Sequence, residues 1–300
     1  MKDKIIRQGL REITADEVVL IQDVVKRFPK LSRQELAQTL CEHLNWHGPS
    51  GAPKVRNCLM LLERLADQEL VLLPDKSARG RLTTDKSPSF THRTDERLLI
   101  QCSLQEISPI ELQLATDKQQ TQLWNEYMER YHPLRYKRPF GNWLRYFMLA
   151  DGEPLGCLLI GGAAKTIYYR DRWIGWDVSH RRHNLSWVIN NSRYLIFPWV
   201  QIPHLASHAL GQLVRRVAQD WETRWGYRPV LIETFVDPEQ YAGICYQAAG
   251  WEKLGMTSGV GITRPGKHYS TSPKNIFVKP LHRHFRDLLC SQQLQGRIIE

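Results

Sequence analysis

The sequence predicts an α+β protein, with an N-terminal winged-helix-like helical module followed by a mixed α/β domain. Two capping boxes, at residues 14–17 and 32–35, mark helix starts in the first part of the chain. In the second part, strand-like runs alternate with amphipathic helices, and residues 229–236 form the mostly apolar run typical of a buried central strand. We therefore expect a module over residues 1–82, a linker over 83–97 and an α/β domain over 98–300.

Three helices are expected in the N-terminal module. Apolar residues recur at helical spacing after each capping box, and a third helix is expected to begin near Pro53, a residue favourable in a first turn. A short strand over residues 70–74 and a basic loop follow. This is the winged-helix order, in which the third helix enters the major groove of DNA and the loop contacts phosphate. The alternative is a plain helical bundle that holds the second domain.

The exposed face of the third helix and the basic loop supply the predicted nucleic-acid contacts of this module. These contacts are Lys54, Arg56, Asn57, Arg79 and Arg81. Acidic residues on the same helices dilute the basic face. No metal site is predicted, because Cys41, His43 and His47 supply three ligands where structural zinc takes four.

The α/β domain is predicted as a series of strands and helices. Strands are expected over residues 98–104, 143–149, 154–161, 193–200, 229–236 and 275–281, and helices over residues 116–131, 207–225 and 241–249. Asp151 and Gly152 mark a hairpin turn between the second and third of these strands.

The chain is basic, with a formal net charge of +10, and the charge is uneven. Residues 254–286 contain no Asp or Glu but six Lys or Arg and three His. Clustered positive charge favours a polyanion, because each neutralised phosphate releases condensed counterions. Further phosphate contacts are therefore predicted at Arg135, Lys137, Arg138, Lys267, Lys274 and Arg283. A basic surface with no dedicated partner is the alternative.

The apolar runs, the first residues and the cysteines of the sequence all argue against a membrane or secreted protein. No apolar run reaches the roughly 18 residues that a membrane span needs. The first residues are charged throughout and contain no apolar segment typical of a secretory signal. The six cysteines are scattered and never form a CxxC pair, which fits a reducing compartment. We predict a cytoplasmic protein with no membrane partner.

Two carboxylates near the end of the central strand are the first candidates for chemistry. Glu233 lies within an apolar run and Asp237 follows four residues later. Ligands gather outside the carboxyl ends of strands in open α/β sheets, and paired carboxylates can hold a divalent cation for phosphoryl chemistry. The alternative is that they form ion pairs with Arg193 or Arg228.

Two further groups are candidates for a site. Cys245 and His208 form a nucleophile and base if the fold brings them together, although a cysteine on a short apolar helix is more often a core residue. An aromatic ring at Trp176 can stack on a base, and Asn190 and Asn191 can bind a base edge. A packed Trp and a turn-forming Asn pair are equally consistent with this pattern.

The order strand, helix, strand, short helix resembles the GNAT acetyltransferase fold over roughly residues 98–281. That family holds acyl-CoA with a glycine-containing loop at the start of the central helix, and the pyrophosphate sits on the free N–H groups there. At the matching positions this chain has His204 for Gln or Arg and Ser207 for Gly. Acetyl-CoA is therefore not the expected cofactor. The resemblance also places Tyr246 where a tyrosine often protonates the leaving thiolate.

A longer set of motifs resembles the Druantia anti-phage system protein A family. These motifs are residues 173–176, 190–196, 198–200, 205–208, 233–237 and 243–246, in this order, together with residues 32–74. The resemblance implies phage defence or association with mobile DNA elements, including transposition, and other proteins of such a system as partners.

Three hypotheses follow, in this order. The first is a DNA-binding component of a defence or mobile-element system. The second is an enzyme acting on nucleic acid or nucleotide through a cleft containing Glu233 and Asp237. The third is a GNAT-type acyltransferase. Whether the protein is an enzyme stays open at this point.

Overall fold

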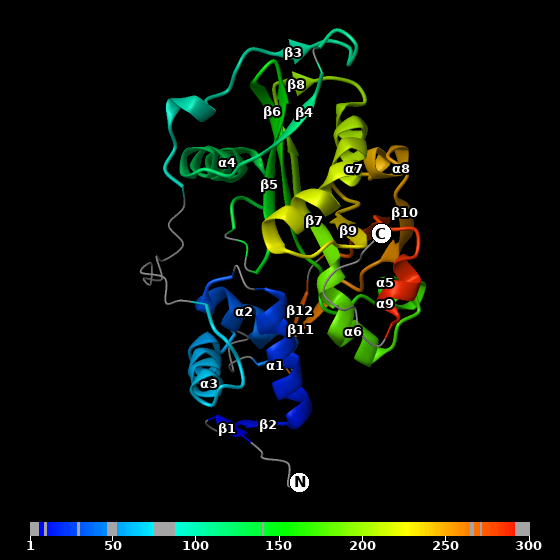
Figure 1. Ribbon diagram of the computed structural model, residues 1–300. Coiled ribbons are helices and arrows are strands. Elements are labelled where there is room, and N and C mark those ends of the chain that lie inside the picture. Colours follow the sequence, from blue (N-terminus) through cyan, green and yellow to red (C-terminus); the bar gives the residue numbers. More distant parts are fainter. Residues whose placement is uncertain are drawn as a thin grey trace.

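The computed structural model describes residues 6–8, 11–28, 31–46, 53–74, 88–107, 109–137, 139, 141–264, 267–270 and 272–291. For residues 182, 260–264 and 267–270 it describes the backbone alone. Three N-terminal helices lie at one end of a large β-sheet, which has helices on both sides (Figure 1). The α+β class predicted from the sequence is confirmed.

Both capping boxes form and start the helices that the sequence predicts. The hydroxyl of Thr14 accepts from the Glu17 N–H, and the Ser32 hydroxyl accepts from the Glu35 N–H, with each Glu bonding back. A short hairpin that the sequence did not indicate precedes the first helix. The elements are β1 (Ile6–Gln8), β2 (Arg11–Ile13), α1 (Ala15–Arg27), α2 (Arg33–His43) and α3 (Val55–Asp67).

The strand predicted over residues 70–74 is wrong. The backbone there is irregular, because side chains from other elements bind its carbonyls. Gln22 donates to the Leu70 carbonyl at 2.9 Å and Arg33 donates to the Pro74 carbonyl at 2.6 Å. The basic loop, with Arg79 and Arg81, lies outside the described residues. A winged helix is therefore not confirmed.

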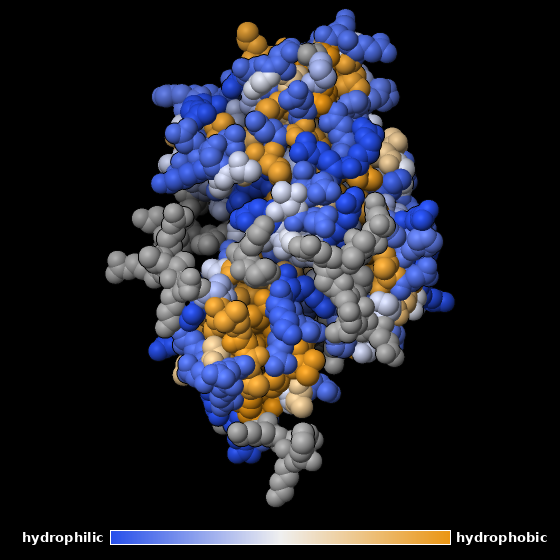
Figure 2. Space-filling model, viewed as in Figure 1, coloured by the Kyte–Doolittle hydropathy of each residue, from blue (hydrophilic) through white to orange (hydrophobic). Residues whose placement is uncertain are grey.

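The third helix buries one apolar face. Its buried face is formed by Cys58, Leu61, Leu62 and Leu65. Apolar side chains gather over the N-terminal helices on the face in view in Figure 2. On α3 the exposed Arg56 stands one turn from Met60, which is 53% exposed, so the exposed surface of this helix is mixed.

The larger part of the chain is built from one seven-stranded sheet, several helices and two short extra ladders. Its strands are β3 (Ile100–Gln101), β4 (Glu111–Leu114), β5 (Leu144–Ala150), β6 (Glu153–Gly162), β7 (Val188–Ile196), β8 (Val200–Gln201), β9 (Leu231–Val236), β10 (Glu252–Met256), β11 (Val260–Arg264), β12 (Lys267–Ser270) and β13 (Asn275–Pro280). Its helices are α4 (Lys118–Tyr131), α5 (Tyr168–Ile174), α6 (Val178–Asn184), α7 (Leu205–Trp225), α8 (Ile244–Ala248) and α9 (Phe285–Leu289).

The sheet has the order β10-β13-β9-β7-β6-β5-β4. Strands β7 and β9 pair in parallel, and the other neighbours pair antiparallel. The order strand, helix, strand, short helix on which the acetyltransferase resemblance depends is present as β7, α7, β9 and α8. A parallel pair needs such a crossover, and α7 supplies it.

Helices cover both faces of the sheet (Figure 1). Phe147 on β5 contacts Tyr127 of α4, with ring centroids 6.4 Å apart. Its neighbour Tyr146 donates its hydroxyl to Asp220 of α7 at 2.8 Å. Because adjacent strand residues point to opposite faces, α4 and α7 lie on opposite sides of β5.

Two predicted strands differ from those observed. Of residues 98–104, two form β3, which pairs in parallel with β8. The strand expected over residues 193–200 begins earlier, at Val188. Asn190 and Asn191 therefore lie inside β7 and do not form a turn.

The N-terminal helices pack directly against the larger part of the chain. The rings of Phe28 and Tyr227 meet edge to face, with centroids 5.3 Å apart. The guanidinium of Arg27 lies 4.2 Å from the ring centroid of Trp187. Buried residues of both parts form one continuous core. Within the part of the chain that the structure describes, every helix is too short or too polar to cross a bilayer.

Candidate functional site

A cleft opens where the parallel strands β7 and β9 separate. Their pairing ends at Asn190 and Glu233, although β7 continues to Ile196 and β9 to Val236. The cleft has a volume of about 650 Å³. It lies at the carboxyl ends of the two parallel strands, which is the usual ligand position in an open α/β sheet.

The cleft is lined by segments far apart in the sequence. The last residue of α4 and the loop after it contribute residues 131–134, β7 contributes residues 191–196, and α7 contributes Ala206 from its first turn. The end of β9, the following loop and α8 contribute residues 234–237 and 240–246. Lys274, which precedes β13, completes the lining with Pro198.

Asn191 organises the floor of the cleft. Its amide oxygen accepts from the Tyr246 hydroxyl at 2.8 Å, and its backbone carbonyl accepts from the Thr234 hydroxyl at 2.9 Å. Its amide nitrogen donates to the carbonyls of Arg193 and Leu159 at 2.9 and 3.3 Å. Asn191 is 3% exposed, and its side chain is held by β6, by β7 and by α8.

A β-bulge on β7 places Arg193 in this cleft. Asn191 pairs with Ile160 and Arg193 pairs with Leu159, so Ser192 is an extra residue on β7. The Arg193 guanidinium donates to the Ser192 carbonyl at 2.7 Å. Among the described residues, no carboxylate is within ion-pair distance of it. Burial lowers the pKa of Arg193 below its ordinary value.

His132 lies beside Arg193 in the cleft lining. Burial, and then the positive charge of Arg193, lower the pKa of His132 to about 4. Its Nδ1 accepts from the Leu134 N–H at 3.1 Å. The imidazole is therefore neutral near pH 7, with its proton on Nε2, and it adds no charge to the cleft.

Asp237, just after β9, and Lys274, just before β13, also line the cleft. The Ser272 hydroxyl donates to the Asp237 carboxylate at 2.7 Å and the Glu239 N–H donates at 3.1 Å. These two hydrogen bonds, and then the charge of Lys274, lower the pKa of Asp237. Arg193 and Lys274 leave the cleft lining with one more positive than negative charge.

Of the predicted nucleophile and base, one lies in the cleft. Cys245 lines it, and burial raises the pKa of its thiol, which keeps it protonated. His208 is exposed on α7 outside the lining, with its Nε2 2.9 Å from the Gln212 side-chain nitrogen. Burial also raises the pKa of Tyr246, whose hydroxyl is held by Asn191. The structure therefore shows no activated cysteine here.

The predicted pairing of Glu233 with Asp237 in one cleft is wrong. The carboxylate of Glu233 is fully buried and accepts from the Arg170 guanidinium at 2.9 Å and from the Ala164 N–H at 2.8 Å. Arg193 and Arg228, the expected alternatives, are not its partners; Arg228 lies 3.6 Å from Glu222. The partner comes from α5, and it holds Glu233 away from the cleft.

Of the polar-aromatic residues predicted near β7, neither Trp176 nor Asn190 lines the cleft. Trp176 is 8% exposed, and its ring N–H donates to Asp171 at 3.0 Å, so it is not an exposed stacking surface. Asn190 lies beside the cleft and outside its lining, and its amide oxygen is buried with no hydrogen-bond partner among the described residues.

The predicted basic contacts are spread over several separate parts of the fold. Exposed Arg135 and Lys137 follow the cleft-lining loop directly, and Arg135 lies 3.7 Å from Glu129. Exposed Lys54 and Arg56 and partly buried Asn57 lie on α3 and just before it. Arg283 is exposed before α9, Lys267 lies in the β11–β12 hairpin, and Arg138 lies outside the described residues.

The described part of the chain contains no group of three or more His, Cys, Asp or Glu side chains arranged to hold a metal ion. The buried position of Glu233 also removes one ligand of the divalent-cation site suggested by the sequence.

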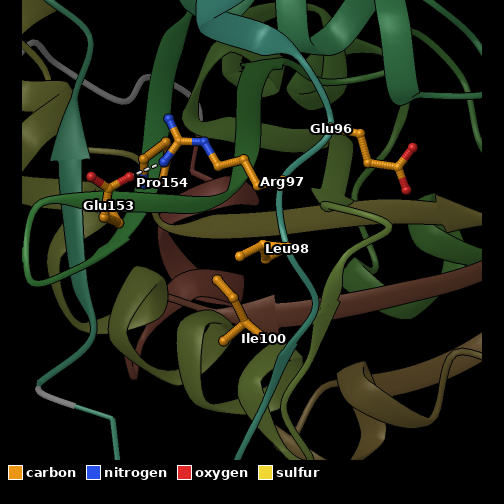
Figure 3. Close-up of a pocket in the computed structure, with 6 residues that line it drawn as sticks. All are labelled: Glu96, Arg97, Leu98, Ile100, Glu153 and Pro154. Atoms are coloured by element: carbon orange, nitrogen blue, oxygen red, sulfur yellow. Dashed lines mark hydrogen bonds and ion pairs between the residues drawn. The ribbon is translucent and has the colours of Figure 1, made fainter.

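A second hollow lies over the short β3–β8 ladder and is lined by Glu96, Arg97, Leu98, Ile100, Glu153 and Pro154. Figure 3 shows Arg97 bonded to Glu153 across this hollow, with Glu96 directed to the opposite side. Because its cation is already paired, this hollow is a weaker candidate for a charged ligand than the cleft at Arg193.

Sequence reasoning missed His132, Arg193 and Tyr241 as cleft residues. Arg193 could have been noticed in the sequence. It is a basic residue in a strand-like run, and neither residue two positions away on the same face is acidic, so no ion pair within the strand explains it. His132 and Tyr241 lie in loops, and their position depends on where those loops return to the sheet.

No curated protein matches this chain. Aminoglycoside acetyltransferase AAC(6')-Ib with ribostamycin and coenzyme A is similar at 17% identity and a TM-score of 0.38, covering 59% of this chain and 96% of that one. An N-acetyltransferase from Staphylococcus aureus Mu50 is similar at 10% identity and a TM-score of 0.35, covering 58% and 99%.

The family match includes every residue that lines the cleft except Lys274. Residues 65–272 match the family described as Druantia protein DruA. The match runs from the end of α3 to the segment before β13, and it includes both diverging strands, α7 and α8. The first two helices precede it. This chain therefore belongs to the family of Druantia protein DruA, a defence-system protein.

Proposed function

We propose that this defence-system protein binds nucleic acid, and that the cleft between β7 and β9 is a principal contact. The observation that carries the proposal is the partly buried Arg193, which faces no carboxylate among the described residues. Burying a charge without a partner costs free energy. An anionic ligand that accepts hydrogen bonds from Arg193 would offset this cost and would therefore bind favourably.

The surroundings of Arg193 favour a polyanion. Lys274 lines the same cleft, and Arg135 and Lys137 stand on the loop that forms one of its walls. The whole chain carries a formal charge of +10. Arginine binds phosphate oxygens with two parallel hydrogen bonds, which suits the single fixed guanidinium at the bulge. Lys54, Arg56 and Asn57 stay predicted contacts of the N-terminal helices.

Salt-titrated binding of labelled DNA tests this proposal. Wild-type affinity should fall linearly with the logarithm of salt concentration. Arg193→Gln should weaken binding by roughly tenfold, equivalent to about 1.4 kcal/mol, and reduce the slope by about 1. Arg224→Gln is the matched control, because Arg224 is exposed at the far end of α7, roughly 27 Å along the helix axis from Ala206. Binding that ignores salt, or equal effects of both variants, contradicts the proposal.

A second candidate is an acyltransferase that uses acyl-CoA. It is favoured by the position of the cleft at the carboxyl ends of the parallel pair, beside the first turn of α7. Against it, the Ser207 hydroxyl donates to the His204 carbonyl at 3.0 Å where the acetyltransferase loop has glycine. Calorimetry with acetyl-CoA tests it, and the absence of any binding heat would remove it.

A further inference from the structure

The mouth of the cleft combines exposed apolar side chains with the cations described above. Leu134, Tyr241 and Ile244 all line it and are 54%, 58% and 68% exposed. Leu134 comes from the loop after α4, and the other two come from the loop before α8 and from α8 itself. Large apolar side chains from separate segments that converge at one opening are typical of a binding surface.

The two kinds of side chain suit the two parts of a nucleotide. Arg193 and Lys274 can contact phosphate, and the ring of Tyr241 presents a face for stacking. A duplex keeps its bases stacked inside and offers their edges in the grooves. An unpaired base can leave its neighbours and stack on an aromatic side chain. The apolar mouth therefore adds binding free energy for a single strand and none for a duplex.

The size of the opening supports the same ligand. A volume of about 650 Å³ is within the range of roughly 300–1,000 Å³ that small-molecule sites occupy. One nucleotide fits such a space, whereas a double helix remains outside it.

The floor of the cleft predicts little base preference. Both donor hydrogens of the Asn191 amide are directed to backbone carbonyls, and its oxygen is held by Tyr246. Thr234 donates to the Asn191 carbonyl. Because these groups are already bonded, they are not free to read the edge of a base, and stacking is tolerant of sequence.

We propose that the cleft selects single-stranded nucleic acid, with a phosphate at Arg193 and an unpaired base against Tyr241. This inference rests on the proposed function and adds strandedness to it. Arg193 supplies affinity for any phosphate chain, and Tyr241 supplies the preference for an unpaired strand.

Competition between an oligothymidylate and a blunt duplex of equal length tests the inference. Wild-type protein should prefer the single strand, and Tyr241→Ala should weaken single-strand binding by roughly tenfold with little effect on the duplex. Tyr241→Phe should retain the preference, because it keeps the ring. Tyr168→Ala is the matched control, because Tyr168 is 65% exposed on α5 and does not line the cleft. A 2-aminopurine base in the strand should be quenched by wild type and not by Tyr241→Ala.

The outcomes separate the two proposals. If Arg193→Gln weakens both ligands while the duplex binds as well as the single strand, strand selection is wrong and the proposed function stands. Unchanged preference in Tyr241→Ala also overturns strand selection. If the wild-type protein binds neither ligand, both proposals fail.

Discussion

The carboxylate of Glu233 lies 2.9 Å from the guanidinium of Arg170, and neither side chain is exposed to solvent. Arg170 also donates to the Ala164 carbonyl at 2.7 Å and to Asp171 at 2.8 Å. Burial raises the pKa of Glu233, although the positive charge of Arg170 opposes the shift. The pair connects α5 to the central strand β9 from the side away from the cleft.

Replacing Glu233 should therefore change stability. Glu233→Gln removes one of the two carboxylates that pair with the buried Arg170 and leaves Asp171 as the other. The free energy of unfolding should therefore fall by about 3 kcal/mol, the lower end of the range for breaking a buried ion pair. Asp237→Asn, just beyond the end of the same strand, should change it much less, because Asp237 is partly exposed and the asparagine oxygen can still accept from Ser272 or Glu239. Urea unfolding of both variants measures the difference. Equal stability of the two variants would show that the buried pair is not structural.

The hydrogen bond from the Tyr246 hydroxyl to the Asn191 side chain should also stabilise the folded protein. Tyr246→Phe removes its hydrogen bond and leaves the buried Asn191 oxygen without this donor. We expect the free energy of unfolding to fall by about 1–3 kcal/mol. Tyr241→Phe is the control, because Tyr241 is 58% exposed at the cleft mouth and should tolerate the change. A thermal melt of each variant checks this, and identical melting temperatures would count against it.

Stability should decline in mild acid because of two histidines. Burial, and then nearby positive charges, lower the pKa of both His43 and His132 to about 4. Between that value and about 6.5 the unfolded chain binds protons that the folded chain does not. Stability is therefore fully present above pH 6.5 and falls by at most about 1.4 kcal/mol per pH unit for each histidine as pH decreases.

Urea midpoints measured across this pH range test the prediction. His132→Gln should reduce the slope, because it removes one of the two titrating groups. His208→Gln, a change at an exposed histidine on α7, should leave the slope unaltered. A stability profile that is flat between pH 6.5 and 4 would refute the assignment.

The capping boxes give a prediction for the N-terminal helices. Ser32→Ala removes the hydroxyl that accepts from the Glu35 N–H and should cost about 1 kcal/mol. Thr14→Ala should cost a similar amount, because Thr14 makes the equivalent contact at α1. The two effects should add, because the caps belong to separate helices. Chemical denaturation of the single and double variants measures this, and no loss in either single variant would contradict it.

Local features of the sequence predicted much of the fold. The helix starts at Thr14 and Ser32 were predictable because each cap bonds within three residues of itself. The expected helix over residues 207–225 corresponds closely to α7, and the apolar run over residues 229–236 corresponds to β9. The strand expected over residues 70–74 was wrong because Gln22 and Arg33, distant in the sequence, bind its carbonyls.

The sequence by itself determined most of the element types, the positive charge and the family to which the chain belongs, because these depend on residue spacing and residue identity. The tertiary structure alone decided that Glu233 is buried against Arg170 and that Arg193 lies in a cleft with no ion pair to any described carboxylate. The physical reason is that these positions depend on strand register. One extra residue at Ser192 and the separation of β7 from β9 after Asn190 decide which side chains face the opening. Neither can be inferred from spacing along a single strand.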